Sequence, residues 1–445
     1  MQGLEAILSK GSDLVWSWPL IILLFGTHIY LTIRLKFIQR YIGRAIRISF
    51  SRKREGVGDI SQFGSLMTAL AATIGTGNIV GVATAVASGG PGAVLWMWLT
   101  GVFGIATKYS EALLAVKYRI TDPDGAMAGG PMYVLERGLG WKWLGIMFAV
   151  FTVIASFGIG NMVQANSISV LLKDTFHVSN WISGAVMTIL TAAVILGGIK
   201  SIARTCKGLV PFMAVFYIVG CLVILAINYK SIPQSIMLII NSAFSGQAAI
   251  GGFIGAGVKE AIRYGVARGL FSNESGLGSA PIVAAAAQTK TPVRQALVSC
   301  SGTFWDTVVV CALTGLVVVS SGDWTHGLSG AVLTKSAFAD IPYIGPVVLT
   351  VGLLAFVFST ILGWSYYGEK AAEYLFGIKA IKPYRYLWIA AVMVGSVATL
   401  PAVWSFADIA NGLMAVPNLI SLIVLAPVIC RETRQYFSEH SAGSD

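Results

Sequence analysis

Two glycine-rich interruptions in long apolar stretches carry the residues of this chain that could bind small molecules or ions. The first lies at 71–81 and contains GTGN at 75–78, and the second lies at 269–281 and contains SNESG at 272–276. In lipid every backbone N–H and C=O group must be bonded internally, so a broken helix is tolerated only where it lines a protein-enclosed or water-filled cavity. Interrupted spans in corresponding halves of a chain are typical of a transporter's binding site.

The first interruption offers both kinds of backbone group to a ligand. Its small residues at 75–78 can adopt non-helical angles, and the N–H groups that begin the next half-helix would attract a carboxylate. The carbonyl groups that end the preceding half, around Ala71 and Ile74, could ligate a hard cation such as sodium. The alternative is a close packing face between helices, where small residues are also common. The presence of the second interruption favours the binding site.

Glu274 places a carboxylate at membrane depth inside the second interruption. Ionisable residues there are functional candidates by default, and three roles are open: receiving a substrate ammonium, taking a proton, or holding the irregular backbone by accepting N–H bonds. We favour the structural role slightly. Neutral donors and acceptors are supplied by Ser272, Asn273, Gln164 and Asn166.

A further polar group lies in the ninth apolar span, where Ser359 and Thr360 are adjacent. Such hydroxyls usually bond the carbonyl three or four residues back. In a chain with two interrupted spans, we expect them instead to complete an oxygen cage for sodium with the carbonyls of the first interruption. Trp364, one turn further on the same face, is expected to limit substrate size. Asp306 is expected to serve in a structural pair or a gate.

The elements that position these residues are membrane-spanning helices. Hydrophobic residues make up 56% of the 445-residue chain and charged residues 11%, whereas soluble domains have roughly 25% charged residues. Apolar stretches of about 18 residues or more are long enough to cross a bilayer. We therefore expect an all-α polytopic membrane protein with about eleven transmembrane helices. The expected spans are 15–35, 62–88, 92–118, 143–172, 181–199, 208–228, 256–287, 295–319, 345–374, 384–401 and 405–429.

Lysine and arginine residues predict the orientation of these spans, because they concentrate on the cytoplasmic side. Seven of them lie at 36–54, between the first two spans, and alternation puts most other basic loops on the same side. We expect the N-terminus outside, the C-terminus in the cytoplasm and no nucleic-acid partner for the net charge of +11. Lys259, Arg263 and Arg268 fall on the outer side, where they would cap or snorkel from a short half-helix. The segment 36–54 is either an amphipathic helix on the membrane or a solvated loop.

Setting the first span aside leaves two sets of five, each opening with one of the interruptions. The sets begin on opposite sides of the membrane, as in transporters built from inverted repeats. The expected divisions are 1–55 (an extra span, retained rather than cleaved, with the basic segment), 56–230 (first repeat), 231–430 (second repeat with an extracellular connecting helix) and 431–445 (a cytoplasmic tail). The five cysteines and four histidines have no disulfide or metal-ligand spacing.

Several sequence blocks, spread in order over nearly the whole chain, carry a family resemblance. They are GTGN at 75–78, GGPGAVLWMW at 89–98, ATKYSE at 106–111, GGPMY at 129–133, GNMVQAN at 160–166, RGLFSNE at 268–274 and GWSYYGEK at 363–370. These blocks resemble the alanine or glycine:cation symporter family, the sodium:alanine symporters. That family lies in the amino acid–polyamine–organocation superfamily and shares the fold of the bacterial leucine transporter. Ser275 and Leu277 stand where the family has Ala and Met, which bears on fine selectivity.

The resemblance implies sodium-coupled, sometimes proton-coupled, uptake of small neutral amino acids, chiefly alanine and glycine. It implies that the Thr76 and Gly77 amides hold the substrate carboxylate and that Trp364 closes the pocket. The groups that would face the amino group are Asn78, Gln164 and the backbone of Phe271, Ser272 and Asn273. The sodium ligands would be the carbonyls of Ala71, Ile74 and Phe356 with the hydroxyls of Ser359 and Thr360.

We therefore expect a secondary active transporter in the plasma or inner membrane of a prokaryote, surrounded by lipid and functional as a monomer. Sodium would bind first, stabilise an outward-open state and order the first interruption, and one half would then rock against the other. A proton-coupled symporter that relies on Glu274 is the alternative. A channel would need a through-going polar pore, and an enzyme would need an acid/base or metal constellation that the sequence does not display.

Overall fold

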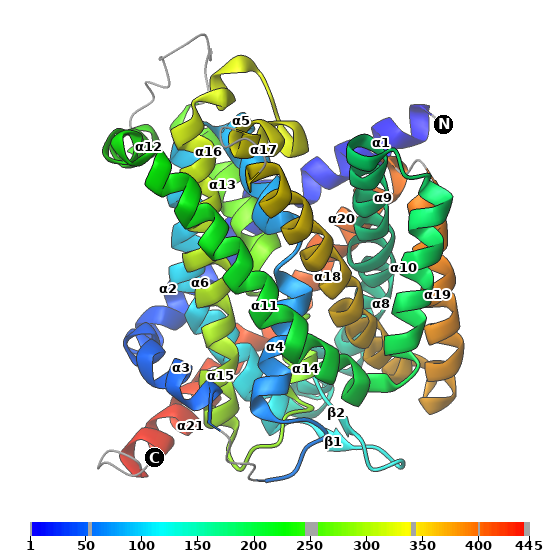
Figure 1. Cartoon of the computed structure of the whole chain (residues 1–445). Helices are drawn as coiled ribbons and strands as arrows, with labels where there is room; N and C mark the ends of the chain where they lie inside the picture. The colour runs from blue at the N-terminus through cyan, green and yellow to red at the C-terminus, as the bar shows by residue number, and fades with distance from the viewer. Residues whose placement is uncertain (1, 52–55, 245–256, 340–343, 399–400, 440–445) are drawn as a thin grey trace.

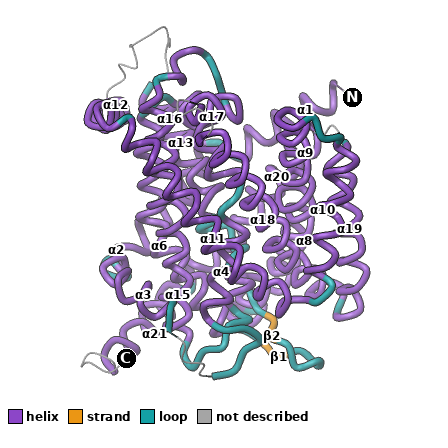
Figure 2. Tube along the Cα trace, in the orientation of Figure 1, coloured by secondary structure: helices purple, strands orange, loops and turns teal. Residues whose placement is uncertain are grey.

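The described part of the computed structural model comprises residues 2–51, 56–244, 257–339, 344–398 and 401–439, and it is nearly all helical (Figures 1 and 2). Within these ranges, extended pairing in named strands is limited to the hairpin of β1 (Ile120–Thr121) and β2 (Met127–Ala128), in which Ile120 faces Ala128. The expected all-helical class is confirmed.

Six helical stretches among the described residues are long and apolar enough to cross a membrane. They are Ala6–Arg34, Lys142–Phe176, Gly198–Ile227, Pro292–Ser321, Gly345–Phe376 and Ser405–Val424. The bent pair Gln62–Thr73 and Gly77–Gly89 makes a seventh when it is counted as one span. Other expected spans coincide with helices that are too short or too polar by the same measure, such as the 16-residue α10 (Asn180–Ile195). The total of eleven spans therefore stays a prediction.

The helices before the second interruption include both long spans and short helical segments. They are α1 (Gln2–Val15), α2 (Trp18–Arg34), η1 (Ile38–Tyr41), α3 (Ile42–Ser49), α4 (Gln62–Thr73), η2 (Gly77–Gly81), α5 (Val82–Gly89), α6 (Gly92–Lys117), α7 (Pro131–Tyr133), η3 (Val134–Gly138), α8 (Lys142–Phe157), η4 (Gly158–Met162), α9 (Val163–Phe176), α10 (Asn180–Ile195), α11 (Gly198–Ile227), η5 (Tyr229–Ser231), α12 (Ile232–Phe244) and α13 (Val258–Asn273).

The helices that follow the second interruption complete the molecule. They are α14 (Pro281–Ala284), α15 (Pro292–Thr303), η6 (Phe304–Cys311), α16 (Ala312–Ser321), η7 (Asp323–His326), α17 (Gly330–Ala339), α18 (Ile344–Phe376), η8 (Ile378–Ala380), α19 (Ile381–Val397), α20 (Pro401–Val424) and α21 (Ala426–Glu439). Four segments, η2, η3, η4 and η6, are π-helical. Such segments often occur at functional sites.

The core is organised around α18, which packs against α4, α8, α9 and α11. Figure 1 shows α6, α13, α15 and α16 to one side of this centre and α8, α9, α10 and α19 to the other. The side chains of Phe356, Trp364, Tyr366 and Tyr367 are at most 1% exposed. Large apolar residues on several faces of a helix indicate that it is surrounded by protein. α18 is therefore buried along its middle part, and its side chains contact both interruptions.

The two ends of the molecule are formed by different elements. Helices α1, α12 and α17 lie at one end, and the β1–β2 hairpin and α21 lie at the other (Figure 1). At this second end lies the described part of the basic segment, residues 36–51. It contains η1 and α3, as expected for a helix rather than for a loop. Ala45, Ile48 and Ser49 of α3 are buried, and Ser49 Oγ lies 3.2 Å from Ser301 Oγ on α15. The segment is therefore packed on the protein rather than solvated on all sides.

Candidate transport site

The first interruption separates α4 from η2 by a bend of 54°. Ile74 leaves the helix with an extended backbone, and the Gly75 N–H donates to Asn78 Oδ1 at 2.9 Å. A Cβ atom on Gly75 would lie 2.6 Å from Thr360 Oγ1 on α18. Only glycine lets the two elements approach this closely, so contact with α18 shapes the interruption as much as its own side chains do.

Five oxygen atoms from α4, Ile74 and α18 come together beside the first interruption. Ser359 Oγ lies 3.1 Å from the Ala71 carbonyl oxygen and 2.8 Å from that of Phe356. Thr360 Oγ1 lies 3.4 Å from the Ile74 carbonyl oxygen and 2.9 Å from that of Phe356. All five residues are buried. Each hydroxyl thus faces a carbonyl on its own helix and another across the interface, and hard cations prefer oxygen donors of this kind.

The second interruption begins at Glu274, which has a left-handed backbone with φ of 54°. Its Oε1 accepts a hydrogen bond from Trp364 Nε1 at 2.9 Å, and its Oε2 accepts one from Ser279 Oγ at 2.5 Å. The side chain is 3% exposed. The carboxylate therefore holds both the irregular backbone that follows α13 and the indole on α18.

A second carboxylate, Glu111 on α6, binds the same interruption from the other side. Its Oε1 accepts backbone N–H bonds from Gly276 at 3.0 Å and Gly278 at 3.1 Å, and a side-chain bond from Asn418 Nδ2 at 2.6 Å. Both glycines have positive φ, 90° and 87°, a region that glycine occupies readily. Glu111 thus has a structural role, since it holds the backbone that follows Glu274 and connects it to α20.

Asp306, in η6, joins the two interruptions. Its Oδ1 accepts from Asn78 Nδ2 at 2.8 Å, and its Oδ2 accepts from Ser272 Oγ at 3.0 Å and Thr307 Oγ1 at 2.6 Å. Asn273 does not contact Asp306: its Oδ1 accepts the Ser275 N–H at 2.9 Å, and its Nδ2 donates to Thr100 Oγ1 on α6 at 3.5 Å. The polar side chains of Asn78, Ser272 and Asn273 are therefore used within the protein.

A small cavity lies where the interruptions meet α18, α20 and η4. Of the sequence-predicted residues it brings together Thr76, Gly77, Gln164, Phe271 and Trp364, with Thr360 and Glu274. Its remaining lining residues are Ala72, Thr73, Gly75, Ile159 and Asn411. Asn78, Ser272 and Asn273 do not line it. Asn166 lies apart as well, since its Nδ2 donates to the carbonyls of Gly395 and Ala398 at 3.2 and 3.0 Å.

A larger cavity of about 660 Å³ extends from the interruptions toward the end that carries α17. It shares Thr76, Gly77 and Phe271 with the small cavity, and Asn166 lies on its wall. Its other lining comes mainly from α9, α17 and the start of α18. The larger cavity therefore adjoins the small one on the side of α17, with Thr76, Gly77 and Phe271 common to both.

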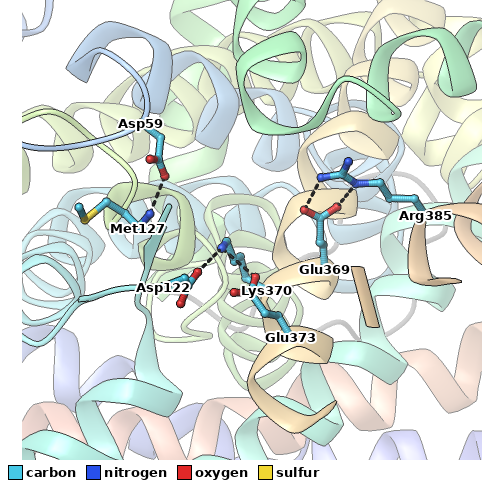
Figure 3. A network of polar contacts seen from close by, with 7 residues as sticks. All are labelled: Asp59, Asp122, Met127, Glu369, Lys370, Glu373 and Arg385. Carbon is cyan, nitrogen blue, oxygen red and sulfur yellow. Dashed lines mark hydrogen bonds and ion pairs between the residues drawn. The ribbon is translucent and has the colours of Figure 1, made fainter. Parts of the chain in front are cut away.

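Ion pairs bind the elements at the opposite end, as Figure 3 shows. Lys370 Nζ on α18 lies 3.1 Å from Asp122 Oδ2 beside the hairpin and 2.8 Å from Glu373 Oε2. Arg385 of α19 makes a paired contact with Glu369, at 2.6 and 2.8 Å. A cavity of about 950 Å³ at this end shares no lining residue with the small cavity.

Backbone contacts reinforce the same end. Arg119 donates to the carbonyls of Ala285, Ala287 and Val57, each at 2.8 Å, and Asp59 Oδ2 accepts the Met127 N–H at 2.9 Å (Figure 3). These contacts connect the segment before α4 with the segment after the second interruption. The two broken helices are consequently tied together at the end away from α17.

The residues that sequence reasoning missed are polar groups on different elements, since Asn411 and Lys370 lie in helices and Arg119 lies between α6 and β1. Asn411 lies in the span expected at 405–429 and carries the same signal that identified Gln164, namely an amide at membrane depth. In the sequence, Lys370 belongs to one of the family blocks and Arg119 to the basic residues of a loop, and neither has an evident partner. Their partners are far apart in the sequence, so no local pattern pairs them.

Solved structures show the class of fold to which the chain belongs. The structure of MhsT in complex with L-phenylalanine matches with a TM-score of 0.56 and 16% identity, over 86% of this chain and 99% of that one. A manganese transporter from Eremococcus coleocola matches with a TM-score of 0.52 and 13% identity, over 85% and 82%. The chain shares the fold of these structures, which is the leucine-transporter fold expected from the sequence.

The particular family follows from sequence. The chain belongs to the sodium:alanine symporter family, which matches residues 1–445. It is 51% identical over 442 residues to the sodium/alanine symporter AgcS of Methanococcus maripaludis, covering 97% of each chain. It is 54% identical over 439 residues to an uncharacterized transporter of Haemophilus influenzae, covering 98% of this chain and 96% of that one. The probable sodium/glutamine symporter GlnT of Bacillus subtilis is 38% identical over 456 residues, covering 100% and 93%. The expected family is confirmed, and its members are transporters, not enzymes.

Proposed function

We propose that this protein couples the entry of sodium to the uptake of small neutral amino acids, chiefly alanine and glycine, into a prokaryotic cell. The name of the AgcS relative supports sodium and alanine, while that of GlnT indicates that substrates of larger size occur in the family. Substrate choice therefore depends on the residues around the small cavity of this chain.

The substrate carboxylate is assigned to the N–H groups of Thr76 and Gly77, where η2 begins. The first N–H groups of a helix have no partner within it and carry a partial positive charge. Gln164 lies across the cavity, fixed by its Nε2, which donates to the Ile159 carbonyl at 3.0 Å. In this assignment Asn78 and Ser272 act through Asp306, shaping the interruptions instead of touching the substrate.

Sodium is assigned to the oxygens of Ala71, Ile74, Phe356, Ser359 and Thr360, and this cluster is the observation that carries the proposal. A cation would face the hydroxyl oxygens once their hydrogens rotate away from the carbonyls. Thr360 also lines the small cavity, so the two ligands would order the same interruption. Ordering by one ligand then lowers the cost of binding the other.

Trp364 is assigned to the wall that limits the side chain of the substrate. It is 1% exposed, and its indole is fixed by Glu274. A Cβ atom on Gly160 of η4 would overlap Trp364 Cβ, so the ring is also held from behind. Each additional methylene is worth about 1–3 kcal/mol in such a pocket, so alanine, glycine and serine should fit and leucine should not.

Transport is proposed to proceed by alternating access between repeats at 56–230 and 231–430, after the extra segment 1–55 and before the tail 431–445. With the N-terminus outside and the C-terminus in the cytoplasm, the 660 Å³ cavity faces outward. The ion pairs of Lys370 then close the cytoplasmic end. A monomer contains the whole proposed path, with lipid around it.

Proton coupling is the second candidate, because Glu274 is a buried carboxylate beside the same cavity. Uptake of radiolabelled alanine into vesicles under an imposed sodium gradient, compared with an imposed pH gradient, separates the two. Sodium-driven accumulation supports the proposal and excludes a channel. Accumulation that follows the pH gradient and does not depend on sodium would show that protons are the coupling ion. It would also contradict the sodium-binding role proposed for Ser359 and Thr360.

A further inference from the structure

Two polar atoms in the wall of the small cavity are buried without a hydrogen-bond partner among the described residues. They are Gln164 Oε1 and Asn411 Oδ1. Both side chains are at most 2% exposed. Buried polar atoms are nearly always bonded, so an unpartnered one in a cavity wall indicates a partner such as a water or a ligand atom. Both atoms are hydrogen-bond acceptors.

Gln164 has its nitrogen engaged within the protein, which leaves its oxygen as the unpartnered atom. Its Nε2 lies 3.0 Å from the Ile159 carbonyl oxygen and 3.4 Å from Thr76 Oγ1. Thr76 and Gly77, at the start of η2, line the same cavity and supply backbone donors. The cavity thus has donors and unpartnered acceptors, which is the polarity that a zwitterionic amino acid requires.

Asn411 stands out by comparison with Asn418, two turns later on the same helix. Both side chains are buried in α20. Asn418 Nδ2 is used within the protein, donating to Glu111 Oε1 at 2.6 Å and to the Gly276 carbonyl at 2.9 Å. Asn411 instead lines the cavity with its oxygen unbonded. One asparagine of α20 therefore supports the second interruption, whereas the other is available to a ligand.

Glu274 is the charged group in the cavity wall beside these amides. Its oxygens accept one bond each, from Trp364 Nε1 and Ser279 Oγ. Its charge favours a cation in the cavity, and the two amide oxygens add neutral acceptors beside it. An ammonium has three N–H donors, and the two amide oxygens can receive two of them.

We infer that Asn411 is a substrate-binding residue that, together with Gln164, accepts hydrogen bonds from the substrate ammonium. The inference rests on the proposed function and adds a ligand from α20, outside both broken helices. With two N–H groups held by the amide oxygens, an N-methyl group fits only at the third position, so the cavity favours a primary ammonium, which can bind in any rotation about its C–N bond.

The test compares alanine with N-methylalanine in uptake assays of the wild-type protein and of N411L, which keeps the number and branching of the side-chain heavy atoms without an acceptor. We expect N411L to raise the KM for alanine by roughly 10-fold to 100-fold, as for loss of a hydrogen bond to a charged group. The KM for N-methylalanine should rise less than the KM for alanine in this variant, because the methyl group can turn toward the leucine side chain. Ser421→Ala is the matched control on α20, since Ser421 Oγ bonds only the Asn418 carbonyl, at 2.7 Å.

The outcomes separate this inference from the proposed function. Wild-type vesicles that do not accumulate alanine under a sodium gradient contradict the proposed function and this inference with it. Active wild-type protein with an unchanged KM in N411L, or with equal losses for the two substrates, overturns the role of Asn411 alone. If N411L does not reach the membrane, N411D, which keeps acceptor oxygens, should preserve the preference for alanine and N411A should reduce it. Equal preference in these two variants would overturn the inference.

Discussion

Glu274 Oε1 accepts a 2.9 Å hydrogen bond from the indole Nε1 of Trp364, joining the second interruption to α18 across the small cavity. The sequence leaves open whether Glu274 supports the backbone or takes part in binding, and the structure gives it a defined contact. It fixes the ring proposed to set the size of the substrate.

Glu274→Ala should weaken size selection. Without its acceptor the indole is free to leave its position, and we expect the preference for alanine over leucine to fall by roughly 10-fold, the equivalent of about one methylene. Competition of leucine against labelled alanine measures this. Glu274→Gln is the matched control, because its amide oxygen can still accept the indole N–H. Leucine exclusion that is unchanged in Glu274→Ala would contradict the assignment.

Ser359→Ala and Thr360→Val should raise the sodium concentration that gives half-maximal uptake. Each removes one proposed ligand, so the effect should reach at least the roughly 10-fold to 100-fold that loss of an outer-shell partner costs a metal site. Ser365→Ala serves as the control, since Ser365 lies on the same helix and its Oγ donates to the Leu362 carbonyl at 2.7 Å. A sodium dependence equal to that of the wild type in both variants would argue against this site.

Gly160→Ala should destabilise the protein and impair transport, because the added Cβ overlaps Trp364. Overpacking of this kind costs about 1–3 kcal/mol, and a thermal melt in detergent would register it as a lower Tm. Gly208→Ala is the comparison, since no atom lies within 4 Å of a Cβ at Gly208 of α11. It should leave Tm unchanged or raise it, and the opposite ranking of the two variants would contradict the packing argument.

Lys370→Gln should loosen the end that we assign to the cytoplasm. The variant breaks the contacts with Asp122 and Glu373, leaving two carboxylates without their cation. A cysteine introduced at Thr73, which lines the small cavity, should then react faster with a reagent added from that end. Lys142→Gln removes an exposed ion pair at the same end, with Glu136 at 3.4 Å, and should have no such effect. Equal labelling rates for Lys370→Gln and the wild type would show that this cluster is not a seal.

The sequence predicted features that depend on local composition. Gly75 and Gly276 mark the interruptions because only unusual backbone angles or close approaches require glycine there. The adjacent hydroxyls of Ser359 and Thr360 were identifiable as partners for the first interruption because the family places them there.

Features that depend on contacts between distant segments escaped prediction. Asn78 was expected at the substrate, yet its amide donates to Asp306, 228 residues away in the sequence. The π-helical turns η4 and η6 lie inside the spans expected at 143–172 and 295–319, where the sequence predicts uninterrupted helix. Asn411 carried a visible signal, but its role depends on which atoms of the cavity wall already have partners.

The central claim is that sodium and a small neutral amino acid bind cooperatively on either side of the first interruption. Equilibrium binding to the purified protein tests it most directly, with alanine affinity measured with and without sodium and sodium affinity measured with and without alanine. The two affinities should rise by the same factor, as linkage requires, and the factor should fall toward one in the Ser359→Ala/Thr360→Val double variant. Alanine affinity that does not change with sodium in the wild-type protein would contradict the account.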